Sequence, residues 1–182
     1  MTTSSPSMIR TALVFGSLAG VAVIFPMLLA MTLTGLENVA FSEALGYLIM
    51  LVALSLILIG IKRYRDEALG GVIGFWRALL VGLMISLVAS AIYVAVWEFY
   101  LYRTDYAFIN HYFDKVIEAQ RQAGATAEVT QLEEMQASYR NPLFRMLVTL
   151  SEIFPVGLLV SLVSAALLRF PGFLPRRRVA SA

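Results

Sequence analysis

Four runs of mostly apolar residues constrain the fold of this 182-residue chain more than any other feature. An apolar segment of about 20 residues crosses a bilayer as a helix, because a helix satisfies its own backbone hydrogen bonds there. Hydrophobic residues make up 59% of the chain and charged residues 14%, a balance outside that of soluble domains. The sequence therefore predicts an all-α integral membrane four-helix bundle, a single membrane domain over residues 1–182. The predicted spans are residues 11–33, 44–61, 75–102 and 143–168.

The alternative interpretation of the first run is a cleaved signal peptide. A signal peptide has an apolar core of about 7–15 residues, followed by a cleavage site of the small-x-small kind. The run 11–33 is longer and no such site follows it, so we expect a membrane span.

Residues 103–141 leave the apolar regime and predict a helical hairpin outside the membrane. Apolar residues recur there at the spacing of a one-sided helix, and Gly124 separates this amphipathic helix from a second one, for which Thr126 is the expected N-cap. Asn141 and Pro142 have the residue types that begin a helix, and they precede the fourth span. The apolar stripe consists of Ile109, Tyr112, Phe113, Val116 and Ile117.

The distribution of basic residues predicts the orientation. Nine of the fourteen Lys and Arg residues lie at the N-terminus, in the region 62–77 or in the C-terminal region from Arg169 to Arg178. Cytoplasmic loops are rich in Lys and Arg, so both termini are expected in the cytoplasm and the hairpin on the opposite, periplasmic side. The Pro171–Arg178 tail is expected at the anionic inner leaflet of the bilayer.

Small residues indicate where helices approach one another closely. Gly16 and Gly20 form a G-x-x-x-G pair in the first span, and intramolecular packing is the simplest explanation of it. In the third span Gly82, Ser86 and Ser90 recur every four residues and therefore share one face. Glu98 continues that face near an aromatic cluster, where we interpret it as an interfacial carboxylate in contact with water.

Glu152 is the strongest candidate for a functional residue, because an ionisable group inside an apolar span is functional by default. Pro155 lacks a backbone N–H and leaves the carbonyl of Ser151 without its helical partner. Arg145 precedes Glu152 by about 10.5 Å along a helix axis, too far for direct contact. We expect Glu152 to hold helices together, and proton or ion coupling is the alternative.

The chain has no signature of catalysis or cofactor binding. It contains no cysteine, no G-x-S-x-G or H-E-x-x-H motif and no phosphate-binding glycine loop, so we expect neither an enzyme nor a cofactor. Its net charge of +2 gives nucleic-acid binding no support. Asp105, His111 and Asp114 supply metal-binding side-chain types, but their helical spacing favours a solvated polar face.

The blocks RALLVGLMISLVASAIYVAVW and YRNPL with SEIFPVGLLVSLVSAALLR resemble the bacterial membrane-protein family catalogued as domain of unknown function 4199. The resemblance implies a bacterial inner-membrane location and transfers no role to any residue.

Two functions fit these patterns. The first is a structural or accessory membrane protein that engages partner proteins or forms a homo-oligomer. The second is a small oligomeric proton- or ion-coupled transporter or channel that uses Glu152; four spans without an inverted repeat would place its pathway between protomers.

Overall fold

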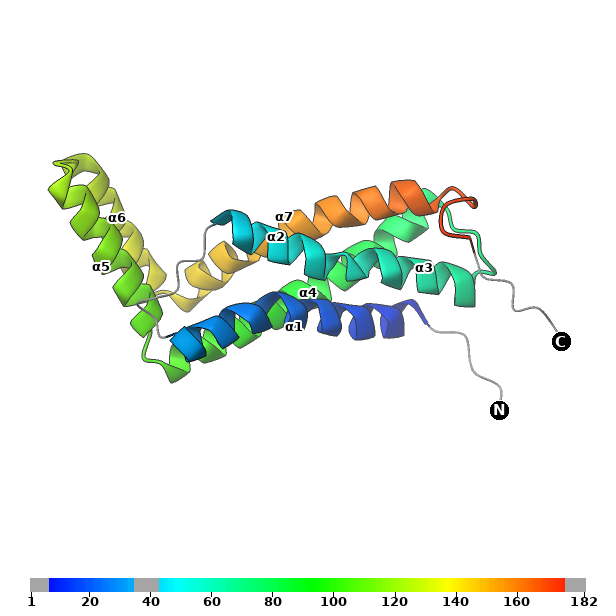
Figure 1. Cartoon of the computed structure of the whole chain (residues 1–182), viewed down its shortest axis with the longest axis horizontal. Helices are drawn as coiled ribbons and strands as arrows, with labels where there is room; N and C mark the ends of the chain where they lie inside the picture. Colours follow the sequence, from blue (N-terminus) through cyan, green and yellow to red (C-terminus); the bar gives the residue numbers. More distant parts are fainter. Residues whose placement is uncertain (1–6, 35–42, 176–182) are drawn as a thin grey trace. The chain divides into compact units, whose positions relative to one another are not determined.

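The computed structural model describes residues 7–34 and 43–175, and within these ranges the regular structure is entirely helical. The all-α prediction is therefore confirmed. The basic residues Arg176, Arg177 and Arg178 of the predicted tail lie outside the described ranges. The helices are α1 (Met8–Thr34), α2 (Glu43–Leu54), α3 (Leu56–Ala68), α4 (Phe75–Arg103), α5 (Ala107–Gln122), α6 (Thr126–Tyr139) and α7 (Pro142–Leu168) (Figure 1).

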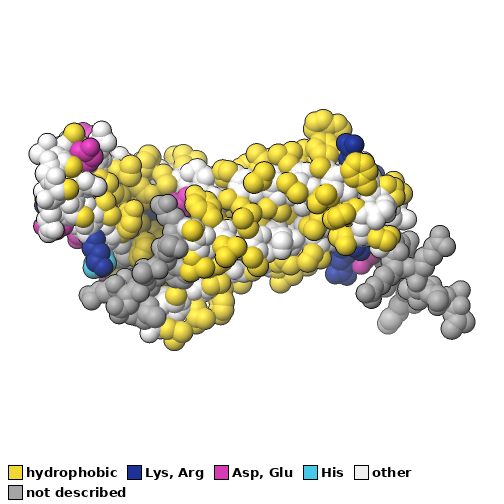
Figure 2. Space-filling model, turned by 45° about the horizontal axis from the view of Figure 1, so that its top comes forward, with side chains coloured by type: hydrophobic (Ala, Val, Ile, Leu, Met, Phe, Trp, Pro, Cys, Tyr) yellow, Lys and Arg dark blue, Asp and Glu magenta, His cyan; other side chains and the backbone are white. Residues whose placement is uncertain are grey.

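Four helical segments are long and apolar enough to cross a membrane, which identifies a multi-pass membrane protein. Only 22% to 39% of the most apolar stretch of each segment is buried, so most of those side chains face outward, as contact with lipid requires. Hydrophobic side chains accordingly dominate the visible surface along the spanning helices (Figure 2). The segments are Met8–Leu33, Ala44–Ala68, Phe75–Arg103 and Pro142–Leu168.

The second span is longer than the sequence predicted, since helix α3 continues to Ala68 and does not end at Ile61. The predicted limit of the span marks the point where basic residues begin, and the helix runs past that point. Two ion pairs at helical i, i+4 spacing join these residues to acidic ones further along α3: Lys62 to Asp66 at 2.6 Å and Arg63 to Glu67 at 2.8 Å. The turn itself follows at Gly70 and Gly71, both at positive φ.

The chain divides into two compact units, Met1–Tyr93 with Glu152–Ala182, and Val94–Ser151. In the first unit, α1 packs on α4 through its two glycines. A side chain at Gly16 would meet Val88, and one at Gly20 would meet the backbone of Ala89. The pair thus lies in an intramolecular contact of the kind that small residues permit.

Helix α7 packs on α4 in the same unit, again through small residues. A Cβ atom at Gly82 would lie 2.9 Å from Ser161, and a Cβ atom at Gly157 would overlap the hydroxyl of Ser86. The Ser161 hydroxyl donates to the carbonyl of Gly157 at 2.7 Å, which satisfies it within its own helix. Larger residues at these glycines would separate the two helices.

In the second unit, α5 and α6 form the predicted helical hairpin and lie side by side (Figure 1). Phe113 and Ile117 of the apolar stripe are buried, and the ring of Tyr139 from α6 packs on Phe113 at 5.3 Å. Thr126 was expected as the N-cap of α6, but Ala125 occupies that position and Thr126 is the first helical residue. The cap of α7 is as predicted, because the Asn141 side chain accepts a hydrogen bond from the Leu143 N–H at 2.9 Å.

Candidate functional site

The second unit contains a buried ion pair between the last turns of α4 and the first turn of α7. The Arg145 guanidinium donates to both carboxylate oxygens of Glu98, from Nε at 2.7 Å and from Nη2 at 2.6 Å. The side chains are 4% and 13% exposed, respectively. Glu98 was predicted to be an interfacial carboxylate in contact with water, and the ion pair with Arg145 is a contact which that prediction did not include. A parallel two-bond geometry of this kind fixes both side chains as well as joining them.

Two further groups complete the surroundings of Arg145. Its Nη1 donates to the backbone carbonyl of Tyr139 at 2.8 Å, and its guanidinium lies 4.7 Å from the centre of the Tyr106 ring. Tyr106 and the preceding Asp105 both have left-handed backbones, with φ of 58° and 48°. Such conformations cost about 1–3 kcal/mol each in residues other than glycine. The strained turn places the Tyr106 ring over the guanidinium.

A cavity of about 340 Å³ adjoins this cluster, and we name it the hairpin cavity. Its walls come from the α4–α5 turn, from α5, from the end of α6 and from the start of α7. Two guanidinium groups, two tyrosines, two amides and one aliphatic side chain line it. These residues are Tyr106, Ile109, Asn110, Gln136, Tyr139, Arg140 and Arg145.

Glu152 was expected to hold helices together, and in this chain it lies exposed on the surface of α7. Ser151 and Pro155 are exposed as well, and the Ser151 hydroxyl donates to the carbonyl of Val148 at 2.7 Å. Within the described residues Glu152 makes no hydrogen bond or ion pair, although it lies within electrostatic range of the buried Tyr93. Helix α7 continues through Pro155 without a break.

Ser86 and Ser90 lie on the buried face of α4, as their spacing with Gly82 predicts. Each is 1% exposed, and neither hydroxyl oxygen has a hydrogen-bond partner among the described residues. Their small size lets α4 lie close to its neighbour. Because Gly157 of α7 has no Cβ atom, the Ser86 hydroxyl fits against it.

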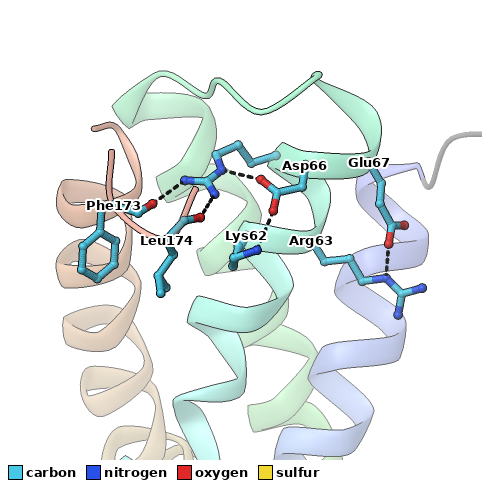
Figure 3. Close-up of polar contacts among 7 residues, drawn as sticks. Lys62, Arg63, Asp66, Glu67, Phe173 and Leu174 are labelled. Carbon is cyan, nitrogen blue, oxygen red and sulfur yellow. Dashed lines mark hydrogen bonds and ion pairs between the residues drawn. The ribbon is translucent and has the colours of Figure 1, made fainter. Parts of the chain in front are cut away.

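A second buried arginine, Arg65, lies near the end of α3 in the first unit, and Figure 3 labels its partners Asp66, Phe173 and Leu174. Arg65 is 0% exposed and donates to the carboxylate of Asp66 at 2.7 Å. It also donates to the backbone carbonyls of Phe173 at 3.0 Å and Leu174 at 2.5 Å, in the segment after α7. Lys62 donates to the other oxygen of Asp66 at 2.6 Å. Arg65 therefore fastens the C-terminal segment to α3.

The structure does not gather the candidate metal ligands into a site. Among the described residues no group of three or more His, Asp or Glu side chains is placed to hold a metal ion. His111 and Asp114 face a wider groove on the hairpin, and Asp105 does not line it.

Sequence reasoning missed the roles of Arg65 and Arg145. Glu98 lies 47 residues from Arg145, and Phe173 and Leu174 lie 108 and 109 residues from Arg65, at sequence separations where helical periodicity gives no information. One signal was available for Arg145: an arginine and a glutamate on two apolar helices are each costly in a bilayer unless they pair.

The comparisons with known proteins give a family and no relative of known activity. No curated protein and no solved structure matches the chain. The family whose members are described as protein of unknown function (DUF4199) matches residues 14–169, most of the chain and all four candidate spans in whole or large part. The chain therefore belongs to the DUF4199 family of proteins of unknown function.

Proposed function

We propose that this protein is an accessory protein of the bacterial inner membrane that binds partner proteins or a second copy of itself. The observation that carries the proposal is the exposed carboxyl group of Glu152, eleven positions inside the candidate span Pro142–Leu168 counted from its first residue. An acidic side chain near the centre of a membrane helix costs about 2.5–3.5 kcal/mol when charged. A polar group on another polypeptide that covers Glu152 reduces this cost, so the exposed carboxyl favours association.

The proposed orientation places both termini in the cytoplasm and the hairpin in the periplasm. It rests on the asymmetry of basic residues, since Lys62, Arg63, Arg65 and Arg77 flank the α3–α4 turn. The hairpin would then be the part of the protein available to periplasmic partners.

Single cysteines introduced into this cysteine-free chain test that orientation. A cysteine at Thr126, at the start of α6, should react with an impermeant maleimide in intact cells. A cysteine at Val72, an exposed residue of the α3–α4 turn, should react only after the cells are opened. The reverse pattern would invert the proposed topology.

Glu152 variants test the proposed association, with native mass measurement in mild detergent and in nanodiscs as the readout. Glu152→Gln retains hydrogen-bonding capacity and should preserve the complex. Glu152→Leu should weaken it by about 0.6–2 kcal/mol, roughly 3- to 30-fold in the dissociation constant. Ser151→Ala is the matched control, because the neighbouring hydroxyl already bonds its own helix and its loss should leave association unchanged.

The same variants separate association from transport. A proteoliposome assay with a pH-sensitive dye should show no proton flux for the parent protein. Flux in the parent that Glu152→Gln abolishes, with assembly and thermal stability unchanged, would favour a pathway between protomers. A parent protein that remains monomeric and purifies without partners would contradict the accessory role.

A further inference from the structure

The hairpin cavity carries a local positive charge. Glu98 neutralises Arg145, so the ion pair contributes little net charge to the wall. Arg140 also lines the cavity, is exposed, and forms no ion pair in the part of the chain that the structure describes. A single guanidinium of this kind matches a ligand group with one negative charge.

The first turn of α5 adds to this charge. Ile109 and Asn110 lie in that turn and line the cavity. The N-cap residue Tyr106 gives no side-chain hydrogen bond to the helix, and the first turn contains no acidic residue. Helix N-termini carry partial positive charge and backbone N–H donors, and anions bind to them when no cap or acid competes.

The cavity wall is held in place before any ligand arrives. Arg145, 3% exposed, is fixed by Glu98, by the Tyr139 carbonyl and by the Tyr106 ring. The side-chain amides of Asn110 and Gln136 add neutral donors at the same cavity. A cavity of about 340 Å³ is large enough for a small polar headgroup.

The position of the cavity along the helices indicates the source of the anion. It lies beyond the last residue of the span that ends at Arg103 and includes Arg145, three residues into the span that starts at Pro142. The ends of spans lie at the level of lipid headgroups. We propose that the hairpin cavity binds the phosphodiester group of an anionic phospholipid, with Arg140 and the first turn of α5 as its anion-binding groups. This inference does not depend on the accessory role.

Trp97 provides the readout, because its ring packs at 5.4 Å on Phe108 in the first turn of α5. In a Trp76→Phe background it is the only tryptophan of the chain. The full-length protein, purified in a neutral maltoside and stripped of lipid, is titrated with dihexanoyl phosphatidylglycerol, inorganic phosphate or octyl glucoside. Phosphatidylglycerol should give a saturable fluorescence change, octyl glucoside should give none, and phosphate alone should bind more weakly than the lipid.

Two cavity variants and one control decide the assignment. Arg140→Gln should weaken phosphatidylglycerol binding roughly tenfold, as the loss of a charged hydrogen bond predicts. Gln136→Phe should block the cavity and adds no second tryptophan. Arg103→Gln removes the same charge near the same level without touching the cavity and should leave binding unchanged. Inorganic phosphate that binds as tightly as the lipid would assign the site to free phosphate instead. No saturable response, or equal weakening by Arg103→Gln and Arg140→Gln, would overturn the proposal.

Discussion

Replacing Arg145 by methionine is expected to lower the free energy of unfolding by about 3–5 kcal/mol, the range for a buried ion pair that loses one member. The change leaves the Glu98 carboxylate buried and removes both of its hydrogen bonds. It also leaves the Tyr139 carbonyl without its donor. Thermal unfolding of the purified protein in mild detergent measures the loss, and hydrogen exchange should show increased opening in α5 and α6.

A double-mutant cycle separates the pair from its surroundings. Glu98→Met alone should be about as damaging as Arg145→Met, because it leaves a buried guanidinium without its carboxylate. The double variant should lose clearly less than the sum of the two single changes. Arg103→Met, at the last position of α4, is the control and should change stability by less than about 0.5 kcal/mol. Additive effects of the two single changes would show that Glu98 and Arg145 do not stabilise the protein as a pair.

Replacing Arg65 by methionine should destabilise the first unit by about 2–3 kcal/mol. Asp66 keeps Lys62 as a partner, and the carbonyls of Phe173 and Leu174 are partly accessible, so the loss is smaller than for Arg145. The more specific result is local. Amide exchange and protease sensitivity of residues 170–175 should rise, because the segment loses both hydrogen bonds to α3.

Arg63→Met is the matched control, and Figure 3 shows Arg63 with its partner Glu67. Arg63 precedes Arg65 in α3 by less than one helical turn and pairs with Glu67. The Arg63 and Glu67 side chains are 58% and 45% exposed, respectively. Exposed pairs of this kind contribute about 0.3–0.5 kcal/mol. If Arg63→Met released residues 170–175 as strongly as Arg65→Met, the specific role of Arg65 would be wrong.

The number of spans and most of their limits could be predicted from the sequence, because span length follows directly from bilayer thickness. The helices begin or end within three residues of the predicted limits for the first, third and fourth spans. For the second span, the helix ends at Ala68, beyond the predicted limit at Ile61. A charged sequence marks the membrane boundary, whereas the helix continues as long as its residues pair along it, as Lys62 and Asp66 do.

The polar contacts between distant segments could not be predicted in the same way. Glu98 and Glu152 both interrupt apolar helices, and the sequence gives no reason to bury the first and expose the second. That difference depends on how α4 and α7 face each other, which neither residue's own helix determines. The left-handed turn at Asp105 and Tyr106 could not be predicted either, because neither residue is glycine, the residue type that usually marks such a turn.

The contacts of Arg65 also impose an order on biosynthesis. Ribosomes deliver the chain from its N-terminus, so Arg65 emerges more than a hundred residues before the carbonyls of Phe173 and Leu174 exist. During that interval Asp66 is the only one of its three acceptor residues already synthesised. The full set of acceptors of the Arg65 guanidinium therefore exists only after the segment that follows α7 has been synthesised.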